Sequence, residues 1–71
     1  MNDKKVDEAV KVLLAATKRF PESSNLQDSL GEALALKGDK AGAKAAYSKA
    51  LALAKTPAEK KRIEGSIAKL K

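Results

Sequence analysis

Apolar residues recur every three or four positions along most of the chain, which is the spacing that places side chains on one face of an α-helix. The first such stripe comprises Val6, Val10, Leu13, Leu14 and Thr17. It ends near Phe20 and Pro21, because proline disfavours helix in the residue before it and cannot continue the hydrogen-bond ladder. The pattern therefore predicts a first helix over about residues 4–20.

A second stripe begins after two serines, Ser23 and Ser24, whose hydroxyls can accept hydrogen bonds from the free backbone N–H groups at the start of a helix. The apolar positions of this stripe are Leu26, Leu30, Ala33, Leu34 and Ala35. Gly38 can adopt the left-handed conformation that closes a helix. The second helix is therefore predicted over about residues 24–37.

The rest of the chain predicts two more helices, each with a start signal. Asp39 suits the N-cap of a helix over about residues 40–55. The segment Thr56-Pro57-Ala58-Glu59 combines a capping threonine, a proline at the first helical position and a glutamate three residues after the cap, so a fourth helix is expected over about residues 57–70. The two apolar stripes are, in order, Ala43, Ala46, Tyr47, Ala50, Leu51 and Ala54, and then Ile63, Ile67 and Leu70.

No segment alternates with a period of two, and residues typical of strands are few, so the predicted fold class is all-α. Loops of two to four residues make consecutive helices antiparallel neighbours, as in an αα-hairpin. With 71 residues the chain forms one domain, residues 1–71, that buries a modest core.

Composition argues against catalysis. The chain contains no cysteine and no histidine, which removes thiol nucleophiles and the usual acid–base group at neutral pH. The glycine-containing segment 38–42 lacks the preceding strand and the terminal Lys-Ser/Thr of a phosphate-binding loop. We therefore expect no enzyme activity, no catalytic residues, no cofactor and no metal site. Without a long apolar run or a signal peptide, we expect a soluble chain, with the cytoplasm favoured.

The formal net charge of +6 comes from the second half of the chain, since residues 38–71 carry nine basic and three acidic side chains. A basic surface can bind nucleic acid or an anionic surface. The candidate residues are Lys40, Lys44, Lys55, Lys60, Lys61 and Arg62. Nucleic-acid bases stack on aromatic rings, and only Phe20 and Tyr47 are available. A solvated lysine-rich face is the favoured interpretation, and nucleic-acid or anionic-surface binding stays as the alternative function.

Several small and apolar residues repeat at an interval of 34 positions. Ala9, Leu13 and Ala16 precede Ala43, Tyr47 and Ala50 by 34, and Gly31, Ala33 and Leu36 precede Gly65, Ile67 and Leu70 by the same interval. Together with Leu30-Gly31, this spacing resembles the tetratricopeptide repeat (TPR), a helix-turn-helix unit of about 34 residues. Lys55 replaces the family's closing proline, although Pro21 stands at the equivalent place after the first helix.

The resemblance covers about one full repeat, the second and third helices, with a flanking helix on each side. It implies stacked αα-hairpins in a right-handed superhelical fragment, with the fourth helix as a cap. We expect the chain to be a fragment or carboxyl-terminal appendage of a longer protein. Gly31 lies within a helix, where glycine costs about 1 kcal/mol relative to alanine. We therefore predict that Gly31 allows the third helix to approach closely, with Ala43, Tyr47 and Ala50 as packing residues.

Repeats of this family usually bind protein or peptide partners in a groove lined by the first helix of each repeat. The resemblance places the groove residues at Asn25, Asp28, Ser29, Glu32, Arg62 and Ser66, with Leu36 beside them. One subset binds the carboxyl-terminal peptides of chaperones through basic and amide groups. Asp28 and Glu32 occupy the corresponding positions here, and carboxylates repel a peptide carboxylate.

We therefore expect a protein or peptide partner of basic or mixed character and no chaperone-type carboxylate clamp. Neither nucleic acid nor membrane is an expected partner, and weak self-association is expected because the first helix lacks its own pair. For Asp28 and Glu32 a solvated helix face is the favoured interpretation, and a role in the groove is the alternative.

Overall fold

The computed structural model describes residues 4–70, which form four α-helices and contain no strand. The helices are α1 (Lys4–Arg19), α2 (Ser24–Lys37), α3 (Lys40–Leu53) and α4 (Pro57–Lys69). The all-α prediction is confirmed. Three helices end one or two residues earlier than expected, and the largest difference is at α3, which stops at Leu53 because the backbone of Ala54 is already extended.

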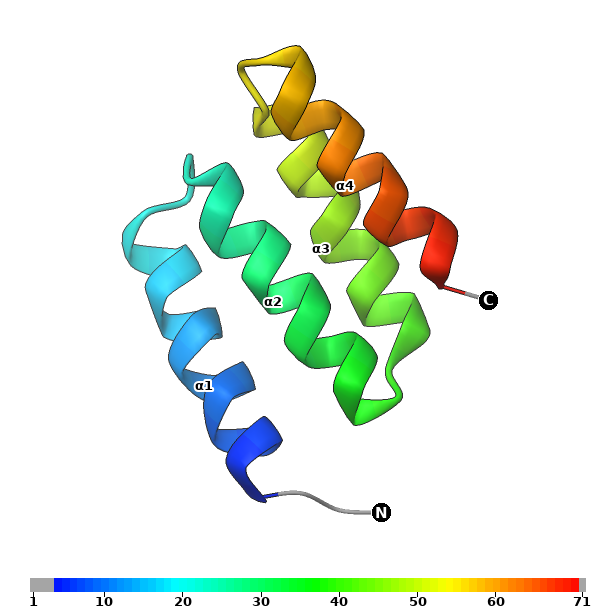
Figure 1. Cartoon of the computed structure of the whole chain (residues 1–71). Coiled ribbons are helices and arrows are strands. Elements are labelled where there is room, and N and C mark those ends of the chain that lie inside the picture. Colours follow the sequence, from blue (N-terminus) through cyan, green and yellow to red (C-terminus); the bar gives the residue numbers. More distant parts are fainter. Residues whose placement is uncertain (1–3, 71) are drawn as a thin grey trace.

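Each helix packs on the next one along the chain, and consecutive helices run in opposite directions (Figure 1). The most extensive contact joins α2 and α3, followed by the contacts of α1 with α2 and of α3 with α4. The molecule measures 35 × 29 × 15 Å, so its shortest dimension is only slightly larger than the diameter of one helix. The fold is a shallow row of helices in which α1 and α4 stand at the two ends.

The sequence signals that limit the helices act through specific hydrogen bonds. Ser23 caps α2 by accepting a hydrogen bond from the Leu26 N–H at 3.3 Å. At the other end Gly38 has a φ of 94°, and the Gly38 and Asp39 N–H groups donate to carbonyl oxygens of the last turn of α2. This is the Schellman arrangement, which a residue with a Cβ atom adopts only with strain. The tight turn places α3 directly against α2.

The buried residues form two clusters on either side of α3. The first, between α1, α2 and α3, consists of Val10, Leu30, Ala33 and Ala46. The second, between α3 and α4, consists of Ala43, Tyr47, Ala50 and Ile63. Leu14 was expected on the buried stripe of α1 but is 44% exposed. The buried stripe is narrower than predicted because α1 packs mainly on one neighbour, α2, and of its five predicted positions only Val10 and Thr17 are buried.

Gly31 brings α2 and α3 together at very short range. A Cβ atom at position 31 would lie 2.7 Å from two carbons of the Tyr47 ring, so the ring occupies the space of the missing side chain. Ala43 and Ala50 flank Tyr47 on α3 and are both fully buried. The prediction that these residues serve helix packing is confirmed.

Candidate functional site

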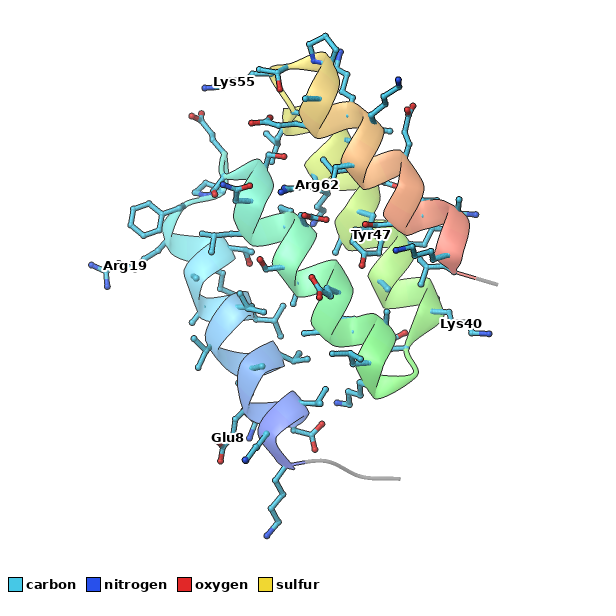
Figure 2. The ribbon with its side chains drawn as sticks, in the orientation of Figure 1. Glu8, Arg19, Lys40, Tyr47, Lys55 and Arg62 are labelled. Atoms are coloured by element: carbon cyan, nitrogen blue, oxygen red, sulfur yellow. The ribbon has the colours of Figure 1, made fainter. Side chains whose placement is uncertain are left out.

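The six predicted groove residues come from two helices that are not consecutive, α2 and α4. On α2 the spacing of Asn25, Asp28, Ser29 and Glu32 places them on one face, and on α4 Arg62 and Ser66 are one turn apart. Arg62 points across to α2 (Figure 2). The face of α2 that carries these residues therefore lies opposite Arg62 of α4, across the predicted groove.

Arg62 links the two sides of this groove. Its Nη2 atom lies 3.0 Å from Asp28 Oδ2 and donates a hydrogen bond of 3.2 Å to Asn25 Oδ1. The Asp28 side chain is only 16% exposed, whereas that of Arg62 is 57% exposed. Because the guanidinium is largely solvated, the ion pair adds little to stability, but it bridges α2 and α4 and engages the Asp28 carboxylate.

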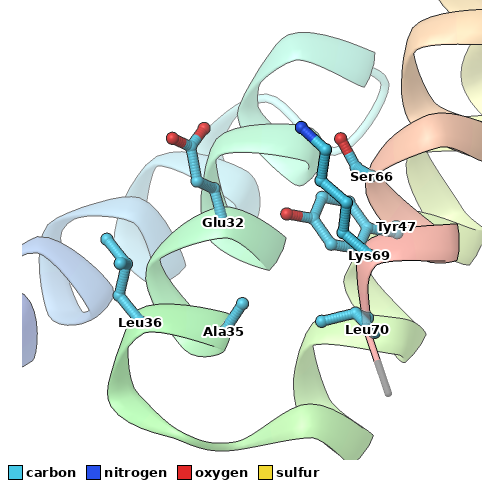
Figure 3. A pocket seen from close by; sticks show the side chains of 7 residues that line it. All are labelled: Glu32, Ala35, Leu36, Tyr47, Ser66, Lys69 and Leu70. Atoms are coloured by element: carbon cyan, nitrogen blue, oxygen red, sulfur yellow. The ribbon is translucent and has the colours of Figure 1, made fainter.

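A cleft of about 390 Å³ opens beside this link, between the C-terminal halves of α2 and α4. It is lined by Glu32, Ala35, Leu36, Tyr47, Ser66, Lys69 and Leu70. Figure 3 shows the Tyr47 hydroxyl directed into the cleft, with Glu32, Ser66 and the Lys69 amine around it and the apolar side chains on the other side. Its volume lies at the small end of the range of ligand pockets. The cleft is large enough for one or two side chains of a partner.

The Tyr47 hydroxyl remains a neutral donor over a wide range of pH. Burial raises the pKa of Tyr47 above its ordinary value, and the Asp28 and Glu32 carboxylates raise it further, while a hydrogen bond with Ser66 acts in the opposite direction. Within residues 4–70 no hydrogen bond or ion pair engages the Glu32 carboxylate. The cleft thus presents a phenol, a carboxylate and an ammonium group above an apolar wall.

The structure brings the predicted residues together in two groups. Asn25, Asp28 and Arg62 form the link, and Glu32 and Ser66 line the cleft. Ser29 is exposed on the same face of α2, but it neither takes part in the Arg62 link nor lines the cleft. The role of these six residues in binding a partner stays a prediction.

Sequence reasoning missed the contributions of Lys69, Leu70 and the Tyr47 hydroxyl to the cleft. For Lys69 a signal was present, since it lies three positions after Ser66 and so shares its side of the helix. For Tyr47, which had been assigned to packing alone, the sequence held no signal that its hydroxyl end reaches the groove.

The basic residues of the second half of the chain do not form a compact patch. Lys60, Lys61 and Arg62 are consecutive in α4 and so diverge by about 100° each. Arg62 is turned toward Asp28, and Lys40 and Lys55 lie at different ends of the molecule (Figure 2). This distribution does not favour the nucleic-acid alternative, because a phosphate backbone binds to a continuous basic surface.

Comparisons with protein-family models, with curated proteins and with solved structures gave no match. No helix within residues 4–70 combines the length and the apolar character needed to cross a membrane. In the same range, no group of three or more acidic, histidine or cysteine residues is placed to hold a metal ion. The class of protein that the structure defines is an all-α domain of four sequentially packed helices.

Proposed function

We propose that this chain is a TPR-like protein-interaction module that binds a peptide segment in the groove between α2 and α4. The link made by Arg62 carries the proposal, because it joins the faces of two alternate helices, and in the TPR arrangement alternate helices line the ligand groove. The 34-residue recurrence of small residues and the contact of Gly31 with the Tyr47 ring support the same arrangement. In this arrangement the hairpins stack in a right-handed superhelix.

The chemistry of the cleft defines the kind of segment that it would take. Ala35, Leu36 and Leu70 offer an apolar wall, and Leu36 is 73% exposed, so a partner's apolar side chain would remove a large surface from water. Glu32 can pair with a lysine or arginine of the partner, and Lys69 disfavours a purely cationic ligand. The segment therefore combines an apolar residue with a neighbouring basic one.

The proposal is tested by selecting peptides from a random display library on the whole chain and titrating the enriched peptides into ¹⁵N-labelled protein. We expect enrichment of peptides with an apolar and a basic residue, and amide shifts centred on residues 32–36 and 66–70. Glu32→Lys and Leu36→Asp should each weaken binding by about 1–2 kcal/mol. The first reverses the charge that pairs with the basic residue, and the second removes an exposed apolar side chain from the wall.

Ala45→Lys is the matched control, since Ala45 is exposed on α3 outside the groove. It should leave the affinity unchanged. If the library yields no enriched sequence, or if the shifts map to the exposed side of α3, the groove is not a peptide site.

A further inference from the structure

The side of α1 that faces away from α2 carries a second, shorter stripe. Glu8, Val12, Ala15 and Arg19 are spaced by four, three and four residues, and all four are exposed. Val12 is 66% exposed although it is a large apolar residue in the middle of a helix. Glu8 and Arg19 lie along the outer edge of α1 (Figure 2). This spacing is that of a coiled-coil seam, in which two helices meet through positions a and d.

The stripe is complementary to itself when two copies pair in opposite directions. With a two-fold axis midway between positions 13 and 14, Glu8 of one copy faces Arg19 of the other, at both ends of the contact. The same axis places Val12 against Ala15 of the second copy. A parallel pairing would instead place Glu8 against Glu8 and Arg19 against Arg19, and like charges that face each other are destabilising.

We propose that two copies of this chain associate through an antiparallel contact of their α1 helices. The small side chain of Ala15 lets the helix axes approach closely, and Val12 is covered by the partner. Lys11 and Lys18 border the stripe on one side and repel each other across the axis, which keeps the association weak. The contact uses the outer side of α1 and leaves the groove between α2 and α4 open, so it is independent of the proposed peptide binding.

Charge reversal provides the first test, by sedimentation equilibrium over a concentration series that reaches the millimolar range. Glu8→Arg and Arg19→Glu should each weaken the dimer roughly tenfold, because each turns two attractive pairs into repulsive ones. An equimolar mixture of the two variants should associate at least as well as the wild type, because an arginine then faces a glutamate at both ends. Far-UV circular dichroism must show unchanged helix content, since Arg19→Glu also loses the contact of Arg19 with the Phe20 ring at 6.0 Å.

Disulfide trapping tests the direction of the pairing, which is possible because the chain has no cysteine of its own. In a glutathione redox buffer, a mixture of Val12→Cys and Ala15→Cys chains should form the mixed disulfide in preference to either symmetric one. Ala45→Cys, on the exposed side of α3, gives the rate of random collision. A wild type that stays monomeric at every concentration, a mixture of charge variants that fails to associate, or symmetric disulfides that form as fast as the mixed one would each overturn the proposal.

Discussion

Tyr47 is the residue at which packing and the candidate site meet. One face of its ring fills the space beside Gly31, and its hydroxyl end reaches the cleft between α2 and α4. The second glycine of the 34-residue recurrence, Gly65, has a different environment, because beyond the adjoining backbone of its own helix no atom lies within 4 Å of a Cβ built at that position. Two glycines that match in sequence therefore differ in what they do.

We expect alanine substitutions at the two glycines to have opposite effects on stability. Gly31→Ala places a methyl group against the Tyr47 ring, at an overpacking cost of about 1–3 kcal/mol, which the gain in helix propensity of about 1 kcal/mol only partly offsets. The melting temperature should fall by roughly 4–8 °C for each kcal/mol of net loss. Gly65→Ala meets nothing, so it should stabilise the protein by about 0.5–1 kcal/mol. Thermal denaturation followed by circular dichroism measures both, and a fall for both variants would contradict the assignment of Gly31 to packing alone.

The raised pKa of Tyr47 predicts a loss of stability at alkaline pH. The folded state holds the phenolic proton more tightly than the unfolded state, so the contribution is complete below the unfolded pKa of about 10. As the pH rises through the folded pKa, the unfolded chain has already lost its proton and stability falls. Tyr47→Phe should remove this component of the decline, which melting temperatures measured up to pH 11 would reveal against the general titration of the lysines.

Because Tyr47 is the only tyrosine and tryptophan is absent, absorbance of the phenolate measures its pKa directly. The midpoint should lie above the ordinary value of 10.0. Glu32→Gln should lower the midpoint, since it removes one of the two carboxylates that raise it. A midpoint at or below 10.0 in the wild type would show that burial does not act on the hydroxyl as described.

At the scale of the elements, the helix limits were the part of the fold most accessible from the sequence. Each start signal works within three or four residues of itself, so its effect does not depend on tertiary structure. At α4 the Thr56 hydroxyl accepts a hydrogen bond from the Glu59 N–H at 3.2 Å, and Glu59 Oε2 accepts one from the Lys55 N–H at 3.0 Å. The reciprocal bond of the expected capping box thus reaches one residue further back than Thr56.

The cap of α4 predicts how much the Thr56 hydroxyl contributes to the free energy of unfolding. Thr56→Ala should lower the free energy of unfolding by about 1 kcal/mol, because the Glu59 N–H loses its acceptor. Thr56→Ser keeps the hydroxyl and should remain close to the wild type. Urea denaturation followed by circular dichroism measures the difference, and equal losses in the two variants would mean that the methyl group of Thr56, and not its hydroxyl, matters.

The sequence could not predict how many neighbouring helices each helix packs against, and the exposure of some side chains depends on that number. Leu14 is exposed because α1 packs mainly on α2 within residues 4–70, and the periodicity of α1 alone contains no such information. Similarly, Arg62 was placed with Asp28 on the groove only through a resemblance to a family, since 34 positions separate the two residues. The local spacing of residues predicts which side chains share a face of a helix. Which helix faces pack against each other is decided by tertiary contacts.

On the scale of the whole molecule, the row of helices has a centre and two ends. α2 and α3 make the most extensive contact and each has a packed helix on either side, whereas α1 packs mainly on α2 and α4 mainly on α3. For the TPR-like array that we propose, stability is expected to be close to a sum of terms between neighbours. The end helices can therefore separate without disrupting the central pair, and the molecule should not unfold as a single cooperative unit under native conditions.

Native-state hydrogen exchange, followed by NMR in dilute protein, tests this expectation. Amides of α2 and α3 should exchange most slowly, through global unfolding, whereas those of α1 and α4 should exchange earlier through local opening. The Ile63 amide is the most informative in α4, because its side chain is fully buried against α3 and marks release of the whole helix. Equal protection in all four helices would contradict the additive description. If the α1 contact between copies forms, raising the protein concentration should slow exchange in α1 while leaving α4 unchanged, since only the face of α1 is covered in the dimer.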